Sequence, residues 1–194
     1  MARWTSGAKE RLQAAAFDAI SRRGFDAVTV AEIAADAGVT ERTFFRYFTD
    51  KREVLFAGQA FLVDAAVGVI HDAGEETEPV ALVRAALGAV AELFPPDRRA
   101  HSRARGAIIA SDPALVEREA QKMRALSSVI TDALRARGTA DPEASLVAQS
   151  SVGVFEIAFR EWIAEGEHRD LGEIQDSLFD RLGALLAPGT TPAG

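Results

Sequence analysis

The sequence TVAEIAADAGVTERTFFRYFTDKREVL at residues 29–55 decides the fold that we predict for this chain. Thr29 and Glu32 form the Ser/Thr-x-x-Glu pattern of a capping box, which predicts that a helix begins directly after Thr29. Apolar residues then recur at helical spacing as far as Ala37, and Gly38 can take the left-handed conformation that ends many helices. The pattern predicts a first short helix of about two turns.

A second helix is expected to follow at once. Thr40 is its N-cap, and Val39 before the cap is placed to contact Phe44 inside the new helix. Two helices joined by about three residues with a glycine at the bend are typical of a helix-turn-helix. Phe44 and Phe48 lie four residues apart and face inward, so the outer face carries the remaining side chains: Arg42, Thr43, Phe45 and Arg46, with Tyr47 at the flank.

This mixture of arginine and aromatic side chains on an outer face indicates a surface that enters a nucleic-acid groove. Arginine can pair with guanine through two hydrogen bonds, an aromatic ring can contact a thymine methyl group, and hydroxyl groups can reach phosphate. The alternative is an ordinary helical hairpin with a solvated basic face. We favour DNA binding because the caps, the glycine turn and the exposed face all agree.

Asp50 is predicted to be a third N-cap, with Glu53 completing another capping box. A long helix is therefore expected from Asp50 to about His71. The free N–H groups at its start, its positive dipole end and Lys51 together predict a phosphate clamp.

Residues 31–55 resemble the DNA-binding head of the TetR (tetracycline-repressor-like) family of transcriptional regulators. The positions that carry this resemblance are Ala34, Ala37, Gly38, Val39, Thr40, Thr43, Phe44, Phe45, Tyr47, Phe48, Asp50, Lys51 and Leu55. The resemblance implies that Arg42, Thr43 and Phe45 approach base edges and that Tyr47 and Lys51 hold phosphates. The family most often has tyrosine where this chain has Phe45, so an apolar base contact is expected there. The full set of expected DNA-contacting residues is Thr29, Thr40, Arg42, Thr43, Phe45, Arg46, Tyr47 and Lys51.

Composition and periodicity predict an all-α chain. Of the 194 residues 48% are hydrophobic, helix signals recur throughout, and strand alternation is absent. We expect about nine helices in three parts: a three-helix head at residues 1–56, a helical body at 57–187 and a disordered tail at 188–194. Further helices are predicted at about residues 6–23, 80–94, 97–109, 113–137, 143–165 and 171–187.

The sequence also indicates where the protein is located and which kinds of chemistry it lacks. The sequence has no run of about 18 apolar residues and no apolar secretory core near its start, so we expect a cytoplasmic protein that does not enter membranes. The absence of cysteine excludes disulfides and thiol chemistry. A single Glu-x-x-His spacing at Glu165 and His168 is too little for a di-metal site, so no metal or cofactor is expected.

The net charge of −7 is unevenly distributed. Residues 1–56 hold 9 basic and 8 acidic side chains, whereas the rest of the chain holds 13 basic and 21 acidic ones. A charged patch sets phosphate affinity, whatever the charge of the whole chain. The acidic body is therefore compatible with DNA binding confined to the head.

The last two predicted helices are expected to form a homodimer. The helix at 143–165 is apolar over more than one face, and the helix at 171–187 carries a stripe of leucine and isoleucine. The resemblance implies a four-helix bundle made from these two helices of each subunit. A monomer with a well-filled core is the alternative.

The body also contains a candidate effector pocket. Phe155, Phe159 and Trp162 recur at helical spacing and, with Met123, can line an apolar pocket, while Arg103 belongs to a basic group that can hold an acidic effector. The alternatives are a plain core for the first four residues and a solvated helix face for Arg103.

These features predict a DNA-binding transcriptional regulator that is not an enzyme. The narrower prediction is a repressor that leaves a pseudo-palindromic double-stranded operator when an unknown small-molecule effector binds the body. Two alternatives remain, an effector-independent dimeric regulator and a helical enzyme with a vestigial head. The lack of a convergent acid, base or metal set disfavours the enzyme.

Overall fold

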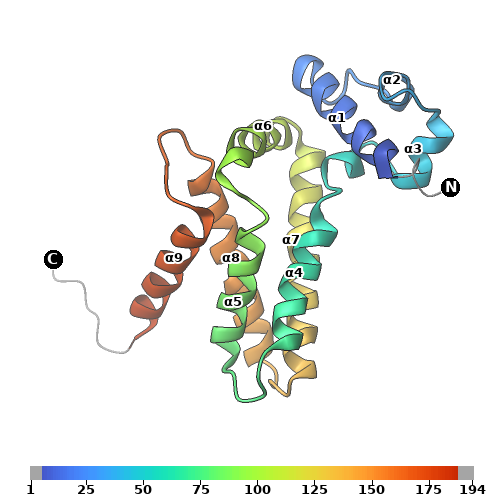
Figure 1. The fold of residues 1–194 in the computed structure, drawn as a ribbon. Helices are drawn as coiled ribbons and strands as arrows, with labels where there is room; N and C mark the ends of the chain where they lie inside the picture. Colours follow the sequence, from blue (N-terminus) through green and yellow to red (C-terminus); the bar gives the residue numbers. More distant parts are fainter. Residues whose placement is uncertain (1–5, 188–194) are drawn as a thin grey trace. The chain divides into compact units, whose positions relative to one another are not determined.

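The computed structural model describes residues 6–187, and the only regular elements in this part of the chain are helices, which confirms the predicted all-α class (Figure 1). The predicted tail at 188–194 lies outside the described residues. The elements are α1 (Ser6–Arg23), α2 (Val30–Asp36), α3 (Glu41–Tyr47), η1 (Arg52–Leu55), α4 (Gln59–Asp72), α5 (Pro79–Ala91), η2 (Pro96–Arg98), α6 (Arg99–Ala110), α7 (Pro113–Ala136), α8 (Glu143–Trp162) and α9 (Leu171–Leu186).

The described residues divide into two compact units. The first holds residues 6–60 and 101–122, and the second holds residues 61–100 and 123–187. No single helix in the described part is long and apolar enough to cross a membrane, whereas Pro79–Ala91 and Pro96–Ala110, bent by 67°, meet that requirement only as a joined pair.

The first unit is built around the helix-turn-helix. The predicted capping box is confirmed, because the Thr29 hydroxyl accepts from the Glu32 amide at 3.2 Å and the Glu32 carboxylate accepts from the Thr29 amide at 2.7 Å. Gly38 has a backbone φ of +67°, a conformation that residues with a Cβ atom rarely adopt. Thr40 then accepts from the Thr43 amide at 3.2 Å, so both short helices begin where the sequence predicts.

The prediction of one long helix from Asp50 to His71 is wrong. Asp50 does act as a cap, since its carboxylate accepts from the amides of Arg52 and Glu53 at 2.7 and 3.2 Å. The Glu53 side chain, however, turns away from the cap and pairs with cations on α7. Only η1 follows, and Phe56 leaves helical geometry to bury its ring in the first core before α4 begins. The predicted helix is therefore interrupted between Leu55 and Gln59, where side chains at and after η1 are buried in the core of the first unit.

Helix α6 and the start of α7 complete the first unit. Ile108, Ile109 and Leu115 are buried in the same core as Leu12 and Phe44. The side chains of Phe17 and His101 stack with ring centroids 4.1 Å apart. Residues far along the chain thus help to hold the helix-turn-helix.

The second unit surrounds its own core. Helices α5, α8 and α9 pack against one another, with parts of α4 and α7 beside them. Trp162 is its largest fully buried side chain, and Asp170 with Glu173 forms the predicted capping box of α9. The predicted helices of the body are present, and their ends differ from the predicted limits by at most three residues, apart from the break before α4.

Candidate nucleic-acid interface and body site

The outer face of α3 carries the side chains predicted to contact bases. Arg42, Thr43, Phe45 and Arg46 together line a hollow in the surface of the first unit. Phe45 is 54% exposed, although its neighbour Phe44 is fully buried and meets it edge-on at 5.4 Å between ring centroids. A phenylalanine held at the surface by a core aromatic ring is available for an apolar contact with a partner.

The polar groups on α3 are preorganised by contacts with one another. The guanidinium carbon of Arg46 lies 5.0 Å from the ring centroid of Tyr47, and its Nη2 donates to the Tyr47 hydroxyl at 3.3 Å. The hydroxyls of Thr40 and Thr43 lie 3.1 Å apart in a hydrogen bond. These contacts limit the freedom of the side chains before any partner binds, which lowers the entropic cost of binding.

Thr29 and its capping partner lie at the start of α2. The hydrogen bond from Arg23 to Glu32, followed by those from Thr29, lowers the pKa of Glu32 from its ordinary 4.5 to about 2. Glu32 is therefore ionised at neutral pH, and its negative charge at the first turn is favourable for the helix dipole.

Lys51 has an internal role that sequence spacing did not reveal. Its Nζ donates to the carbonyl oxygens of Phe25 and Val28 at 2.7 and 2.8 Å, and it lies 4.0 Å from the centroid of the Phe25 ring. Two of its three N–H groups therefore fasten the α1–α2 connection. Any phosphate contact by Lys51 has to use the remaining donor.

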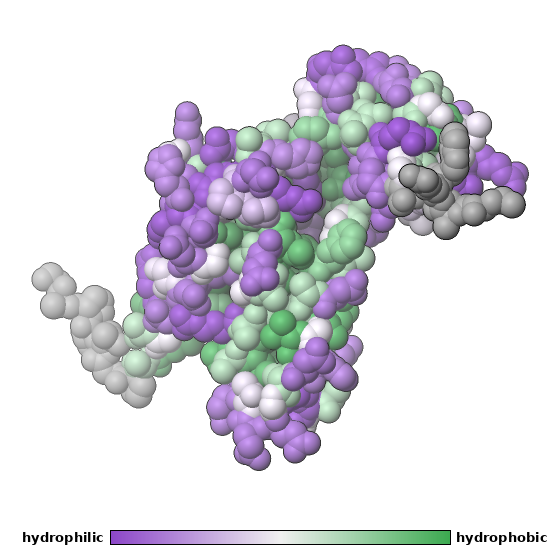
Figure 2. Space-filling view, viewed as in Figure 1, coloured by the Kyte–Doolittle hydropathy of each residue, from purple (hydrophilic) through white to green (hydrophobic). Residues whose placement is uncertain are grey.

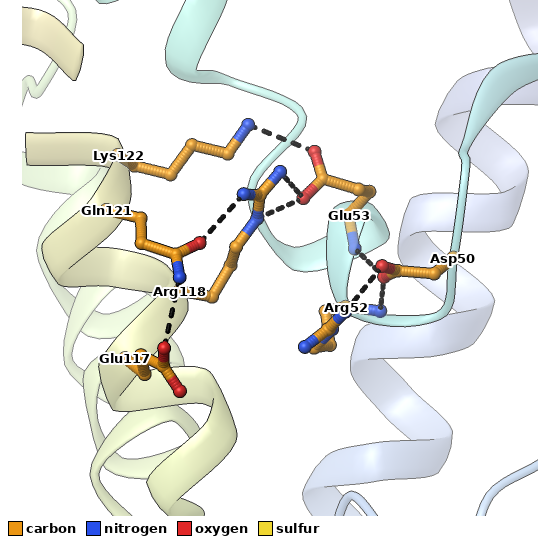
Figure 3. Close-up of polar contacts among 7 residues, drawn as sticks. All are labelled: Asp50, Arg52, Glu53, Glu117, Arg118, Gln121 and Lys122. Carbon is orange, nitrogen blue, oxygen red and sulfur yellow. Dashed lines mark hydrogen bonds and ion pairs between the residues drawn. The ribbon is translucent and has the colours of Figure 1, made fainter.

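A charged cluster joins η1 to the start of α7 (Figure 3). The Glu53 carboxylate accepts from Arg118 at 2.6 Å and from Lys122 at 3.0 Å. Burial raises the pKa of Glu53, but the hydrogen bonds from Arg118 and Lys122 outweigh burial and lower the pKa. Sequence reasoning missed this cluster because Glu53 fitted a local capping box.

Arg105 makes a second link inside the first unit. Its Nε donates to the carbonyl oxygen of Leu55 at 2.9 Å, and its guanidinium pairs with Glu119 at 3.2 Å. Burial lowers the pKa of Arg105, and the interaction with Glu119 opposes this effect. The turn after α3 is therefore held by both α6 and α7.

The second unit brings together four of the five residues of the predicted pocket. Met123, Phe155, Phe159 and Trp162 belong to one apolar cluster, whereas Arg103 is an exposed residue of the first unit. Sequence reasoning missed Phe94, which follows α5 and meets the rings of Phe159 and Trp162 at 5.1 and 6.0 Å between centroids. The sequence places Phe94 at the end of the helix predicted at 80–94, and spacing within one helix does not show which rings of another helix it meets.

Apolar side chains are also exposed on the second unit. Figure 2 shows apolar surface over α4 and α5. On α8 and α9 the exposed large apolar residues are Leu146, Ile157, Leu185 and Leu186, with exposed fractions between 47% and 79%. A helix pair that buries one face in its own core and exposes apolar residues on another is suited to a partner subunit.

A helix-turn-helix whose second helix exposes arginine and aromatic side chains, in a chain with a further helical unit, is typical of a helix-turn-helix DNA-binding protein. The sequence comparisons give its family. Residues 12–57 match the family described as bacterial regulatory proteins, tetR family, and residues 77–187 match the MftR C-terminal domain. The chain belongs to the TetR family of transcriptional regulators.

Solved structures of regulators share this fold. FadR of Thermus thermophilus, a TetR family transcriptional repressor in complex with lauroyl-CoA, is 24% identical over 96% of this chain and 98% of its own, with a TM-score of 0.58. FadR of Bacillus halodurans is 18% identical over 92% and 96%, with a TM-score of 0.60. A regulator of Rhodococcus sp. Rha1 is 23% identical over 92% and 95%, with a TM-score of 0.53. At these identities the likeness shows the fold alone. Among curated proteins, none is significantly similar to this chain.

Proposed function

We propose that this DNA-binding regulator is a repressor that a small-molecule effector releases from its operator. The observation that carries the proposal is the outer face of α3, where Arg42, Thr43, Phe45 and Arg46 line one surface hollow in a TetR-family head. A regulator bound to its operator through this face can repress transcription by excluding other proteins from the same DNA.

The proposed contacts divide into base readers and phosphate holders. Arg42, Thr43 and Phe45 approach base edges in the major groove, whereas Tyr47, Lys51 and the remaining polar residues hold the backbone. Those remaining residues are Thr29, Thr40 and Arg46. The proposed domain limits remain 1–56 for DNA binding and 57–187 for effector binding and dimerisation, and the proposed location is the cytoplasm.

The proposed active form is a homodimer through α8 and α9. Exposed Leu146 and Ile157 on α8 and exposed Leu185 on α9 support this choice, because a partner would remove them from water. A two-fold dimer presents two α3 helices to successive major-groove faces about 34 Å apart. The operator is then a pseudo-palindrome.

The proposed effector binds in the body, near the aromatic cluster of Phe155, Phe159 and Trp162. The complex of Thermus thermophilus FadR with lauroyl-CoA supports the idea that a protein of this fold can hold a partly apolar ligand. Arg103 belongs to the first unit and not to this cluster, so the effector site proposed here does not include it. An effector that prefers the conformation with low DNA affinity reduces operator binding, and DNA reduces effector binding by the same factor.

The proposal is tested by selecting genomic fragments that bind the purified full chain and measuring affinity by fluorescence anisotropy. Arg42→Ala should weaken binding to the selected site by about 1–3 kcal/mol and leave binding to unrelated duplexes nearly unchanged. Arg124→Ala, which removes an exposed arginine of α7 in the second unit, is the matched control. Equal affinity of the wild type and Arg42→Ala for the selected site would overturn the assignment of α3 as the reading helix.

Release is tested separately by adding metabolite extracts and then pure compounds to the protein–operator complex. Loss of the complex with a defined compound supports the effector-controlled repressor. Retention of the complex under every compound that binds the protein supports an effector-independent regulator.

A further inference from the structure

Two N–H donors near the end of α8 are buried and have no acceptor among the described residues. One is Nε1 of Trp162, whose side chain is fully buried. The other is Nε of Arg99, the first residue of α6. Buried polar groups in proteins are almost always hydrogen-bonded, so two unpaired donors in one place call for an acceptor from outside the chain.

The two donors belong to one cluster. The guanidinium carbon of Arg99 lies 5.2 Å from the ring centroid of Trp162. The terminal nitrogens of Arg99 donate to the backbone carbonyls of Glu167 and Arg169, which fixes the guanidinium against the α8–α9 connection. Its Nε takes no part in these contacts.

The positive charge of Arg99 also lacks a carboxylate partner in the described part of the chain. The nearby acidic side chains, Glu161 and Glu167, are paired with Arg169 instead. A carbonyl oxygen accepts a hydrogen bond but does not neutralise a guanidinium. Glu161 and Glu167 together balance the charges of Arg99 and Arg169, so a ligand carboxylate would give Arg99 a direct partner and would not supply a missing charge.

The surroundings of the two donors are aromatic. The ring centroids of Phe159 and Phe94 lie 5.6 and 6.0 Å from that of Trp162. Both phenylalanines are only half-buried, unlike Trp162, so this side of the cluster is reachable from solvent. An apolar group can pack on these rings while its polar end reaches the donors.

We propose that Arg99 and Trp162 bind the carboxylate of an apolar monocarboxylate ligand. One carboxylate has two oxygens, one for each of the two unpaired N–H donors. The apolar part of the ligand packs against Phe94 and Phe159. This inference rests on the proposed function only in treating the ligand as the effector, because the site itself needs no DNA.

Arg99 connects this site to α6. Arg99 begins α6, and residues 101–110 of the same helix belong to the compact unit that holds the helix-turn-helix. A carboxylate that binds Nε alters the balance of contacts holding Arg99 to the α8–α9 connection. The ligand is thereby linked to α6.

The test uses the full chain with Trp4→Phe, which leaves Trp162 as the single tryptophan and fluorescent reporter. The probes are decanoate and 4-phenylbutanoate, each paired with the alcohol of the same carbon skeleton. We expect saturable changes in Trp162 emission, with each acid binding at least tenfold more tightly than its alcohol. Equal binding of acid and alcohol, or no binding of either acid, would overturn the proposal.

Substitutions then separate the two donors, with calorimetry as the readout. Arg99→Met should abolish the preference for acid over alcohol, while the alcohols still bind. Trp162→Phe, which keeps an aromatic ring and removes the N–H, should weaken acid binding several-fold. Arg98→Met, a change at the neighbouring exposed arginine, is the control and should leave the preference intact. Melting curves identify any variant that fails to fold, and the Trp162→Phe result then decides the outcome.

A crystal structure with decanoate supplies the last check. A carboxylate on Arg99 and Trp162 supports the site, whereas an ordered water bridging the two donors with no ligand there refutes it. Operator release is measured in parallel. Acid binding without release refutes the acid as the effector and leaves the site standing. Release by a compound that does not perturb Trp162 refutes the site as the effector site.

Discussion

The carboxylate of Glu53 lies 2.6 Å from the guanidinium of Arg118, which ties the turn after the reading helix to α7 across 65 residues of sequence. The Glu53 and Arg118 side chains are 16% and 30% exposed, so water screens this pair less than a surface ion pair. The contact makes the start of α7 a structural part of the DNA-binding unit.

Loss of the Glu53 charge should destabilise the first unit. Glu53→Gln leaves Arg118 and Lys122 without their anion, and we expect the free energy of unfolding to fall by about 1–3 kcal/mol, between the values for exposed and buried pairs. Urea unfolding at pH 7 measures this change. Glu117→Gln, at an exposed position of α7, should change stability by no more than about 0.5 kcal/mol. Equal effects of Glu53→Gln and Glu117→Gln on stability would contradict a stabilising role for the Glu53 charge.

The same pair should make stability depend on pH in the acidic range. The pKa of Glu53 in the folded chain is below its ordinary 4.5, because hydrogen bonds from Arg118 and Lys122 outweigh burial. Its contribution is complete above the unfolded-state pKa and is lost as pH falls through the lower folded-state pKa. The difference in stability between wild type and Glu53→Gln should therefore shrink below about pH 4.5. A difference that stays constant down to pH 2.5 would argue against an ionic contribution.

Lys51 should affect both stability and DNA affinity. Lys51→Met removes two hydrogen bonds to the carbonyls of Phe25 and Val28, and should lower the free energy of unfolding by about 1.5–3 kcal/mol. If the third donor holds a phosphate, the variant also binds all duplexes more weakly, with a salt slope reduced by about one. Thermal melts and salt-dependent anisotropy measure the two effects. A lower stability with an unchanged salt slope would leave Lys51 with its structural role alone.

Phe45 should matter for DNA and little for folding. Its side chain is 54% exposed, so Phe45→Ala is expected to change stability by no more than about 0.5 kcal/mol while weakening operator binding by about 1–3 kcal/mol. The adjacent Phe44→Ala is the contrasting variant, because emptying a fully buried site costs about 3–5 kcal/mol. Normal operator affinity of Phe45→Ala would remove Phe45 from the set of base contacts.

Dimerisation is tested at the exposed apolar face of α8. Ile157→Asp should raise the dimer dissociation constant at least tenfold, or by about 1.4 kcal/mol, because a charge would have to be buried at the interface. Val80→Asp, at another exposed apolar position outside α8 and α9, is the control. Sedimentation velocity at several concentrations reports the change. A dimer unaffected by Ile157→Asp would place the interface elsewhere.

Local interactions made much of the head predictable. The Thr29–Glu32 capping box and the Thr40 cap each join residues three apart, so both can be predicted from a short segment of sequence. The same holds for the alternation of buried Phe44 and exposed Phe45, which helical periodicity dictates. These features identified the family and predicted which face of α3 contacts DNA.

The predictions that needed correction involve competition between local and distant partners. Glu53 fitted a capping box, but two cations 65 and 69 residues away hold it instead, and the predicted long helix breaks at η1. The phosphate contact predicted for Lys51 stays a prediction, but carbonyls 26 and 23 residues earlier occupy two of its donors, which local spacing did not indicate. The spacing of residues within a short segment cannot predict partners this far away in the sequence. A side chain binds the groups that folding places next to it.

The sequence by itself determined the helical class, the caps, the turn at Gly38 and the outer face of α3, since each depends on contacts within a few residues. Only the tertiary structure decided that α6 and the start of α7 complete the first unit, and that Arg99 lies over Trp162 with an unpaired donor on each. These relationships arise when separate helices bury their apolar faces together, which fixes the positions of polar groups that are remote in the chain.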